Sequence, residues 1–174
     1  MGKSPDHEQL RRLLDIGQAL ASEPDSERML ERVLDEARAI TGARYAALGV
    51  LDDERIGLKR FKTAGVGAAT HRAIGEPPRG RGVLGVLIVD PRPLRLANVE
   101  QHPRSYGLPE GHPPITSFLG VPILIDGEAW GNLYLAEKQD GREFTDADEQ
   151  ALLLLAQWAA TAIRNPNEGL EPLP

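Results

Sequence analysis

The amino-acid sequence predicts an α+β fold, in which one antiparallel β-sheet carries helices packed on one of its faces. Two observations favour this class. Apolar residues recur at helical spacing over residues 7–21, 26–41 and 146–164, near the two ends of the chain. Between these helices, short segments with strand periodicity occur in pairs joined by turn residues. No internal repeat is present, and 174 residues are enough for one domain with its own core.

The N-terminal part predicts two helices. Residues 7–21 keep their apolar side chains on one side of a helix until the segment 23–25, Glu-Pro-Asp, interrupts the pattern. A second helix begins near Ser26 and ends at Gly42, because glycine readily adopts the left-handed conformation that ends a helix.

The chain then changes to strand periodicity. Residues 43–52 and 56–65 predict an antiparallel hairpin, and the Gly- and Pro-rich segment 66–92 predicts short helices over the sheet. Residues 93–99 predict a short strand, which a long loop over 100–116 follows.

The remaining elements are a second hairpin and a last helix. Strands over 117–126 and 129–138 are joined through Asp126-Gly127, a strong hairpin signal. The helix runs from about 146 to 164, with Thr145 as N-cap and Asp148 at the third helical position. We expect one domain over residues 6–165, between disordered segments at 1–5 and 166–174.

Strand alternation assigns the two faces of the sheet. Asn132 and Tyr134 alternate with Leu133 and Leu135 along the last strand. Successive side chains of a strand point to opposite faces, so the leucines face the helices. The other face is therefore expected to hold a ligand pocket beneath the loops and short helices.

Composition excludes several classes of function. The net charge is −6, and 20 Lys and Arg are scattered among 26 Asp and Glu, which argues against nucleic acid or an anionic membrane as partner. No apolar run reaches the ~18 residues of a membrane span, and the N-terminus lacks the apolar core of a signal peptide, so we expect a cytoplasmic protein. Cysteine is absent, which excludes disulfides, thiolate-ligated haem, iron–sulfur clusters and thiol nucleophiles.

Two apparent motifs carry little weight. Residues 80–85, GRGVLG, satisfy G-x-G-x-x-G, but they follow EPPR rather than a buried strand, so we interpret these glycines as turn residues. His7, His71 and His102 show no metal-ligand spacing and are interpreted as surface or loop residues.

His112 differs from the other histidines in its surroundings. Pro113 and Pro114 follow it, and each proline ring locks φ near −65° while Pro113 also restricts His112 to extended conformations. An imidazole whose direction is set in advance suits a metal ligand. A structural loop histidine is the alternative that the residues alone leave open.

The chain resembles a GAF domain over residues of about 6 to 164. More narrowly, the segments GVLGVLI, DPRPLRL, HPPITSFLGVP and GNLYLAEK, all within residues 82–138, resemble the haem-binding first GAF domain of actinobacterial sensor histidine kinases. This group contains the mycobacterial dormancy sensors for oxygen, nitric oxide and carbon monoxide. Ile115 departs from the methionine usual after HPP in this group.

The resemblance implies a site. His112 corresponds to the proximal ligand of the iron of haem b, and Tyr134 to the distal tyrosine that hydrogen-bonds a bound gas. Phe61 corresponds to an aromatic that lines the pocket. Gly49 stands where some members carry an acidic residue near the haem edge, which implies a more open route to the haem here.

The resemblance also implies partners. These are a diatomic gas ligand (O₂, NO or CO), the output domain of a histidine kinase in the parent chain, and a second copy in a homodimer through the first and last helices. The domain itself would be a sensor without a catalytic site.

Two other functions stay open beside the haem sensor. One is a haem-free GAF domain that acts in dimerisation and signal transmission. The other is a small-molecule binder of the cyclic-nucleotide type, because residues 137–149 resemble the Asn-Lys-Phe-Asp-Glu signature of such GAF domains. Glu137 stands where asparagine belongs, and the matching residues are Lys138, Phe144, Asp148 and Glu149. The Lys and Asp of this signature are expected to tie the strand end to the following helix, so a structural ion pair explains it as well as a ligand does. Methionine-sulfoxide reduction and a cysteine-linked bilin both require cysteine and are excluded.

Overall fold

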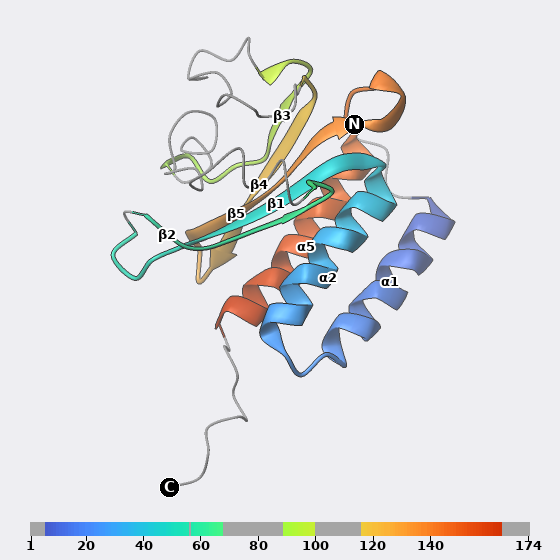
Figure 1. Cartoon of the computed structure of the whole chain (residues 1–174). Helices are drawn as coiled ribbons and strands as arrows, with labels where there is room; N and C mark the ends of the chain where they lie inside the picture. Colours follow the sequence, from blue (N-terminus) through green and yellow to red (C-terminus); the bar gives the residue numbers. More distant parts are fainter. Residues whose placement is uncertain (1–5, 56, 68–88, 100–115, 165–174) are drawn as a thin grey trace, which may run out of the picture.

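The computed structural model describes residues 6–55, 57–67, 89–99 and 116–164. Within these ranges the chain forms three α-helices and five strands, drawn in Figure 1. In chain order they are α1 (His7–Ala21), α2 (Ser26–Thr41), β1 (Ala43–Leu51), β2 (Leu58–Ala64), β3 (Leu94–Leu96), β4 (Phe118–Ile125), β5 (Glu128–Lys138), a 3₁₀ turn (Gln139–Gly141) and α5 (Asp146–Arg164).

The predicted elements are confirmed where the structure describes them. Helices α1, α2 and α5 match the expected ranges, and the predicted strands differ from the observed ones by a few residues at their ends, with β3 the shortest. The 3₁₀ turn after β5 was not among the elements predicted from the sequence. Most of the segment 66–92 and the loop 100–115 lie outside the described residues.

The five strands form one antiparallel sheet in the order β2-β1-β5-β4-β3. Figure 1 shows the three helices on one side of this sheet, with α1 outside α2. The predicted α+β class with helices on one face is therefore confirmed. The core lies between this face and the helices, where Leu30, Leu48, Leu133 and Leu152 are fully buried.

Local signals explain where the helices start and stop. The side chain of Asp25 accepts hydrogen bonds from the amides of Glu27 and Arg28 at the start of α2. Gly42 ends α2 with φ +77°, a conformation that side chains resist. Asp126 and Gly127 both have positive φ, as a two-residue hairpin turn requires.

Helix α1 packs closely on α5 at Gly17. A Cβ placed on Gly17 would lie 2.6 Å from Cζ2 of Trp158, so only glycine lets the two helices approach this far.

No helix in the described ranges is both long and apolar enough to cross a membrane.

Candidate functional site

The sheet face turned away from the helices brings three of the predicted site residues together. Gly49 on β1 pairs with Phe61 on β2 and with Asn132 on β5. Residues directly opposite each other in antiparallel strands point to the same face. Phe61, Gly49 and Asn132 therefore form one row across three strands.

Tyr134 lies in the next row of the same face. It pairs with Ala47 on β1 and with Gly120 on β4. Ala47 lies two residues before Gly49, and Gly120 lies two residues before Pro122, which pairs with Asn132. The alternate residues Leu48 and Leu133 pair with each other and are buried in the core beneath the helices. Tyr134, Phe61 and Gly49 thus share the helix-free face, as strand alternation predicted for Tyr134.

The space above Gly49 is occupied in the structure. A Cβ at this position would lie 3.1 Å from Oδ1 of Asn132 and 3.2 Å from Cδ2 of Leu58. These contacts are tight, so an acidic side chain at this position would require Leu58 to move. The more open route to the haem that the resemblance implied at Gly49 stays a prediction.

Tyr134 belongs to a small apolar cluster on the helix-free face. Its ring stacks on Phe118 with the centroids 5.8 Å apart, and Leu94, Leu96 and Val99 complete the cluster. Burial raises the pKa of the Tyr134 phenol above its ordinary value. The phenol is therefore neutral at physiological pH and can donate a hydrogen bond.

Val99 and Thr116, which flank the segment 100–115, are joined next to the Tyr134 cluster. The Val99 amide donates a 2.8 Å hydrogen bond to the carbonyl of Thr116. Val99 is 6% exposed and packs in the Tyr134 cluster. This hydrogen bond joins the two described residues that flank the segment containing the HPP motif.

His112 itself lies outside the described residues, as do His71 and His102. Its assignment as an iron ligand therefore stays a prediction. Among the residues that the structure describes, no group of three His, Cys, Asp or Glu side chains could hold a metal ion.

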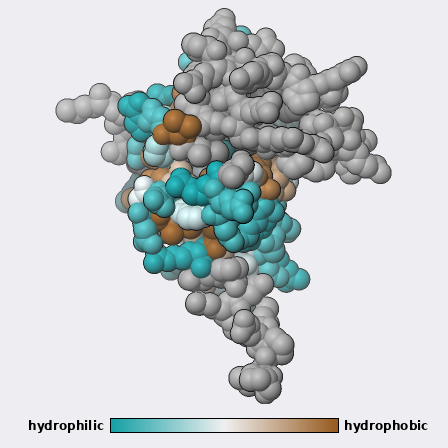
Figure 2. Space-filling model, turned by 90° about the vertical axis from the view of Figure 1, so that its left-hand side faces the viewer, coloured by the Kyte–Doolittle hydropathy of each residue, from teal (hydrophilic) through white to brown (hydrophobic). Residues whose placement is uncertain are grey.

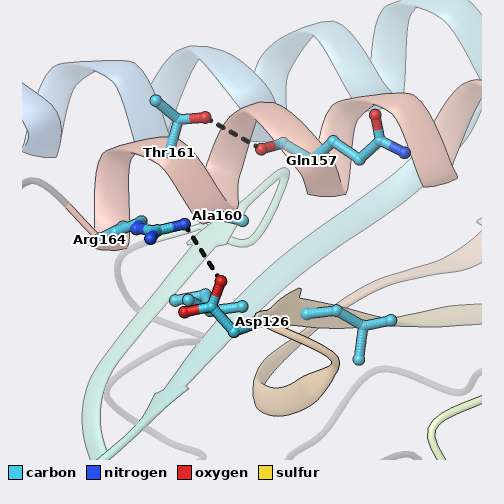
Figure 3. Close-up of a pocket in the computed structure, with 7 residues that line it drawn as sticks. Asp126, Gln157, Ala160, Thr161 and Arg164 are labelled. Carbon is cyan, nitrogen blue, oxygen red and sulfur yellow. Dashed lines mark hydrogen bonds and ion pairs between the residues drawn. The ribbon is translucent and has the colours of Figure 1, made fainter.

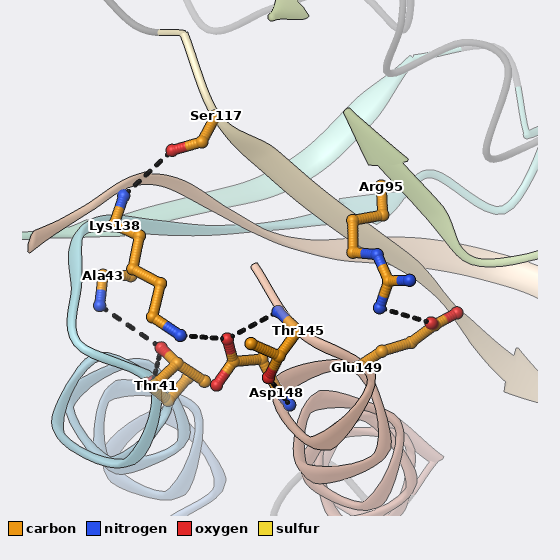
Figure 4. Close-up of polar contacts among 9 residues, drawn as sticks. Thr41, Ala43, Arg95, Ser117, Lys138, Thr145, Asp148 and Glu149 are labelled. Carbon is orange, nitrogen blue, oxygen red and sulfur yellow. Dashed lines mark hydrogen bonds and ion pairs between the residues drawn. The ribbon is translucent and has the colours of Figure 1, made fainter. Parts of the chain in front are cut away.

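Polar contacts gather where β5 ends and α5 begins (Figure 4). Nζ of Lys138 lies 2.5 Å from Oδ2 of Asp148, and these side chains are 16% and 5% exposed. The same carboxylate oxygen accepts from the Thr145 amide at 2.9 Å, and the Asp148 amide donates to Oγ1 of Thr145. The predicted N-cap and the predicted link between strand and helix are confirmed.

These contacts bear on the cyclic-nucleotide alternative. Lys138 and Asp148 are nearly buried and bind each other, and Phe144 is buried as well. Glu149 pairs with Arg95 on β3 at 3.3 Å. The residues that resemble the nucleotide-binding signature therefore hold β3, β5 and α5 together, which indicates a structural role.

A surface cavity of about 470 Å³ lies between the β4–β5 turn and the C-terminal half of α5 (Figure 3). Asp126 and Arg164 face each other across it at 3.4 Å. Figure 2, viewed from the left-hand side of Figure 1, shows hydrophobic residues among hydrophilic ones on that face of the described part of the molecule. Of the predicted site residues that the structure describes, Gly49, Phe61 and Tyr134, none lines this cavity.

A match to a family model identifies the family of this chain. The family model described as "GAF domain" matches residues 23–164, most of the chain. The chain belongs to the GAF domain family. GAF domains are sensory and signalling modules, so the coarser part of the predicted function, a regulatory sensor domain, holds for this chain.

Solved structures support this assignment. The GAF domain of a phosphoenolpyruvate-protein phosphotransferase from Coxiella burnetii is 26% identical with a TM-score of 0.79, and the match covers 90% of this chain and 93% of that one. A free methionine-R-sulfoxide reductase from Neisseria meningitidis is 19% identical with a TM-score of 0.74, covering 98% of both chains. A domain assigned to a two-component sensor histidine kinase of Sinorhizobium meliloti 1021 is 20% identical with a TM-score of 0.61, covering 82% and 92%. The last two show the fold alone.

Proposed function

We propose that this GAF domain is the haem-based gas or redox sensor module of a two-component sensor histidine kinase. In this proposal His112 is the axial ligand of a ferrous haem b, and O₂, NO or CO is the signal. The observation that supports the proposal is the hydrogen bond between Val99 and Thr116, the described residues that flank the HPP segment, next to the Tyr134 cluster on the helix-free face.

Chain length supports the assignment of His112. Four residues of fully extended chain span at most about 14 Å, so this is the greatest separation between the Cα atoms of His112 and Thr116. Thr116 is held to Val99, which belongs to the apolar cluster that Tyr134 packs against. A ligand to the iron and a hydrogen-bond donor for the gas are thereby available from the same region of the fold.

The described residues of this face fit a porphyrin. Ala47 and Gly120 present little or no side chain, so a flat apolar ring can approach the strands there. Phe61 adds an aromatic surface in the row of Gly49. Bound haem would supply an iron atom that coordinates the diatomic ligand.

The chain's own residues have separate tasks. His112 would hold the iron and set the position of the ring, because two prolines restrict its backbone. Tyr134 would donate a hydrogen bond from its phenol O–H to the ligand. Phe61 and Gly49 would line the pocket and exclude water.

The proposal is tested by absorption spectroscopy. We expect the purified chain, or the chain incubated with haemin and reduced, to show an intense Soret band that shifts when CO is added. A chain that stays colourless and does not bind haemin would contradict the proposal and would favour the haem-free GAF domain.

Tyr134→Phe is expected to weaken O₂ binding by about 5- to 150-fold, because a buried hydrogen bond contributes roughly 1–3 kcal/mol. CO affinity should change little, since bound CO carries less negative charge than the outer atom of bound O₂. Both affinities are measured on the ferrous protein. Thr63→Val changes a residue of the same sheet row and serves as the control. An unchanged ratio of O₂ to CO affinity in Tyr134→Phe would show that the tyrosine only packs in the sheet.

A further inference from the structure

Asn132, in the middle of β5, is a buried polar side chain. It is 3% exposed and lies on the helix-free face, where it pairs with Gly49 of β1 and with Pro122 of β4. Its Oδ1 lies 3.1 Å from the position that a Cβ of Gly49 would take, so the amide extends over that glycine. These two neighbours offer no polar side chain, because glycine has none and the proline ring carries neither a donor nor an acceptor.

Asn132 differs from the other buried polar residues of the described chain. The Thr41 hydroxyl donates to one backbone carbonyl at 2.6 Å and accepts from one backbone amide at 3.3 Å. The side chains of Ser117 and Asp148 accept from backbone amides, and Ser26 is paired as well. Of the five buried polar residues that the structure describes, only Asn132 has a side chain without a hydrogen-bond partner.

An unpaired buried amide is costly to the fold. Taking a primary amide out of water without a replacement hydrogen bond destabilises the folded chain, because the lost contacts with water are not recovered. No side-chain nitrogen or oxygen in the described ranges is both sealed from solvent and unpaired, so the Asn132 amide retains a narrow contact with open space. This amide is therefore available to a ligand on the helix-free face.

The chemistry of the proposed cofactor limits what this amide can bind. Haem presents two kinds of polar group, the carboxylates at the rim of the ring and the ligand on the iron. A carboxylate is strongly hydrated, and burying it against a neutral amide leaves its charge unpaired. A diatomic ligand is small and carries no net charge before it binds, so it can enter an enclosed site and accept a hydrogen bond there. Tyr134, the other donor of this face, lies two residues along the same strand, roughly 7 Å away between Cα atoms.

We propose that Asn132 is a second specificity-determining residue of the site, whose amide N–H donates a hydrogen bond to the diatomic ligand on the iron. The proposal rests on the proposed function for the identity of the ligand. This donor favours O₂ over CO, because the outer atom of bound O₂ carries more negative charge.

The first arm of the test measures unfolding of the full chain without a gas ligand, and it gives a result whether or not haem is bound. Asn132→Leu keeps the branching of the side chain and removes its polar atoms. Since the amide has no partner to lose, we expect the denaturation midpoint to equal that of the parent protein or to rise. Thr41→Val, the control, removes a paired hydroxyl of similar burial and should lower the midpoint.

Asn132→Ala adds no volume and shows whether a lower midpoint in Asn132→Leu comes only from overpacking. If both Asn132 variants lower the midpoint as much as Thr41→Val does, the amide serves the fold and the proposal is wrong.

The second arm uses the ferrous protein with O₂ and with CO. We expect Asn132→Leu to weaken O₂ binding by about 2- to 13-fold, the range for one neutral hydrogen bond. The C–O stretching frequency of the CO complex should rise, because the N–H no longer polarises the bound ligand. Thr41→Val should change neither quantity.

Two results of the second arm overturn the proposal. One is an O₂ affinity and a C–O frequency that both equal those of the parent protein. The other is weaker haem retention with an unchanged frequency, which would assign the amide to a haem carboxylate. Failure of the proposed function is seen separately, as a parent protein without a Soret band.

Discussion

His112→Ala is expected to abolish stable haem incorporation and to leave the fold intact. An axial imidazole contributes to cofactor affinity, whereas a loop position contributes little to the core between the sheet and the helices. The measurement is the Soret absorbance per protein after incubation with haemin, with circular dichroism to follow the fold. Added imidazole should restore part of the Soret band in the variant, because it can occupy the vacated coordination position.

His102→Ala is the matched control, since it removes the other histidine of the same segment. We expect its Soret band to equal that of the parent protein. Loss of haem in His102→Ala with retention in His112→Ala would contradict the ligand assignment but not the haem proposal. Retention in both variants would place the iron ligand elsewhere.

Asp148→Ala is expected to lower the free energy of unfolding by about 3 kcal/mol, because it leaves the nearly buried Lys138 ammonium without its partner. It also removes the acceptor of the Thr145 amide at the start of α5. The measurement is a chemical denaturation curve followed by circular dichroism.

Two variants separate these contributions. Asp146→Ala removes another carboxylate of the same first turn, whose pair with Arg95 is half-exposed, and should cost less than about 1 kcal/mol. Asp148→Asn keeps a hydrogen-bond acceptor but no charge, so its stability should lie between that of Asp148→Ala and that of the parent protein. Equal unfolding free energies for Asp148→Ala and Asp146→Ala would show that the buried ion pair contributes nothing.

Much of the site could be anticipated because its signals are local or belong to a motif. The alternation of Asn132 and Tyr134 with Leu133 and Leu135 assigned the two faces of the sheet, although the neighbouring strands were not yet known. The contact between Lys138 and Asp148 could be predicted because both residues belong to one sequence motif, within residues 137–149. The hydrogen bonds that Thr116 donates to the Glu137 carboxylate were missed, because the two residues are 21 positions apart and no pattern in the sequence links them.

The sequence by itself determined the helices, the two hairpins and the caps of this protein. Each depends on residues a few positions apart, such as Gly42 after α2 or Thr145 and Asp148 around the start of α5. The tertiary structure alone decided the register that sets Phe61, Gly49 and Asn132 in one row. It also decided the approach of Gly17 to Trp158 and the left-handed conformation of Glu137. These features arise from contacts between distant segments, whose free energy outweighs local backbone preference only once the sheet and helices have packed.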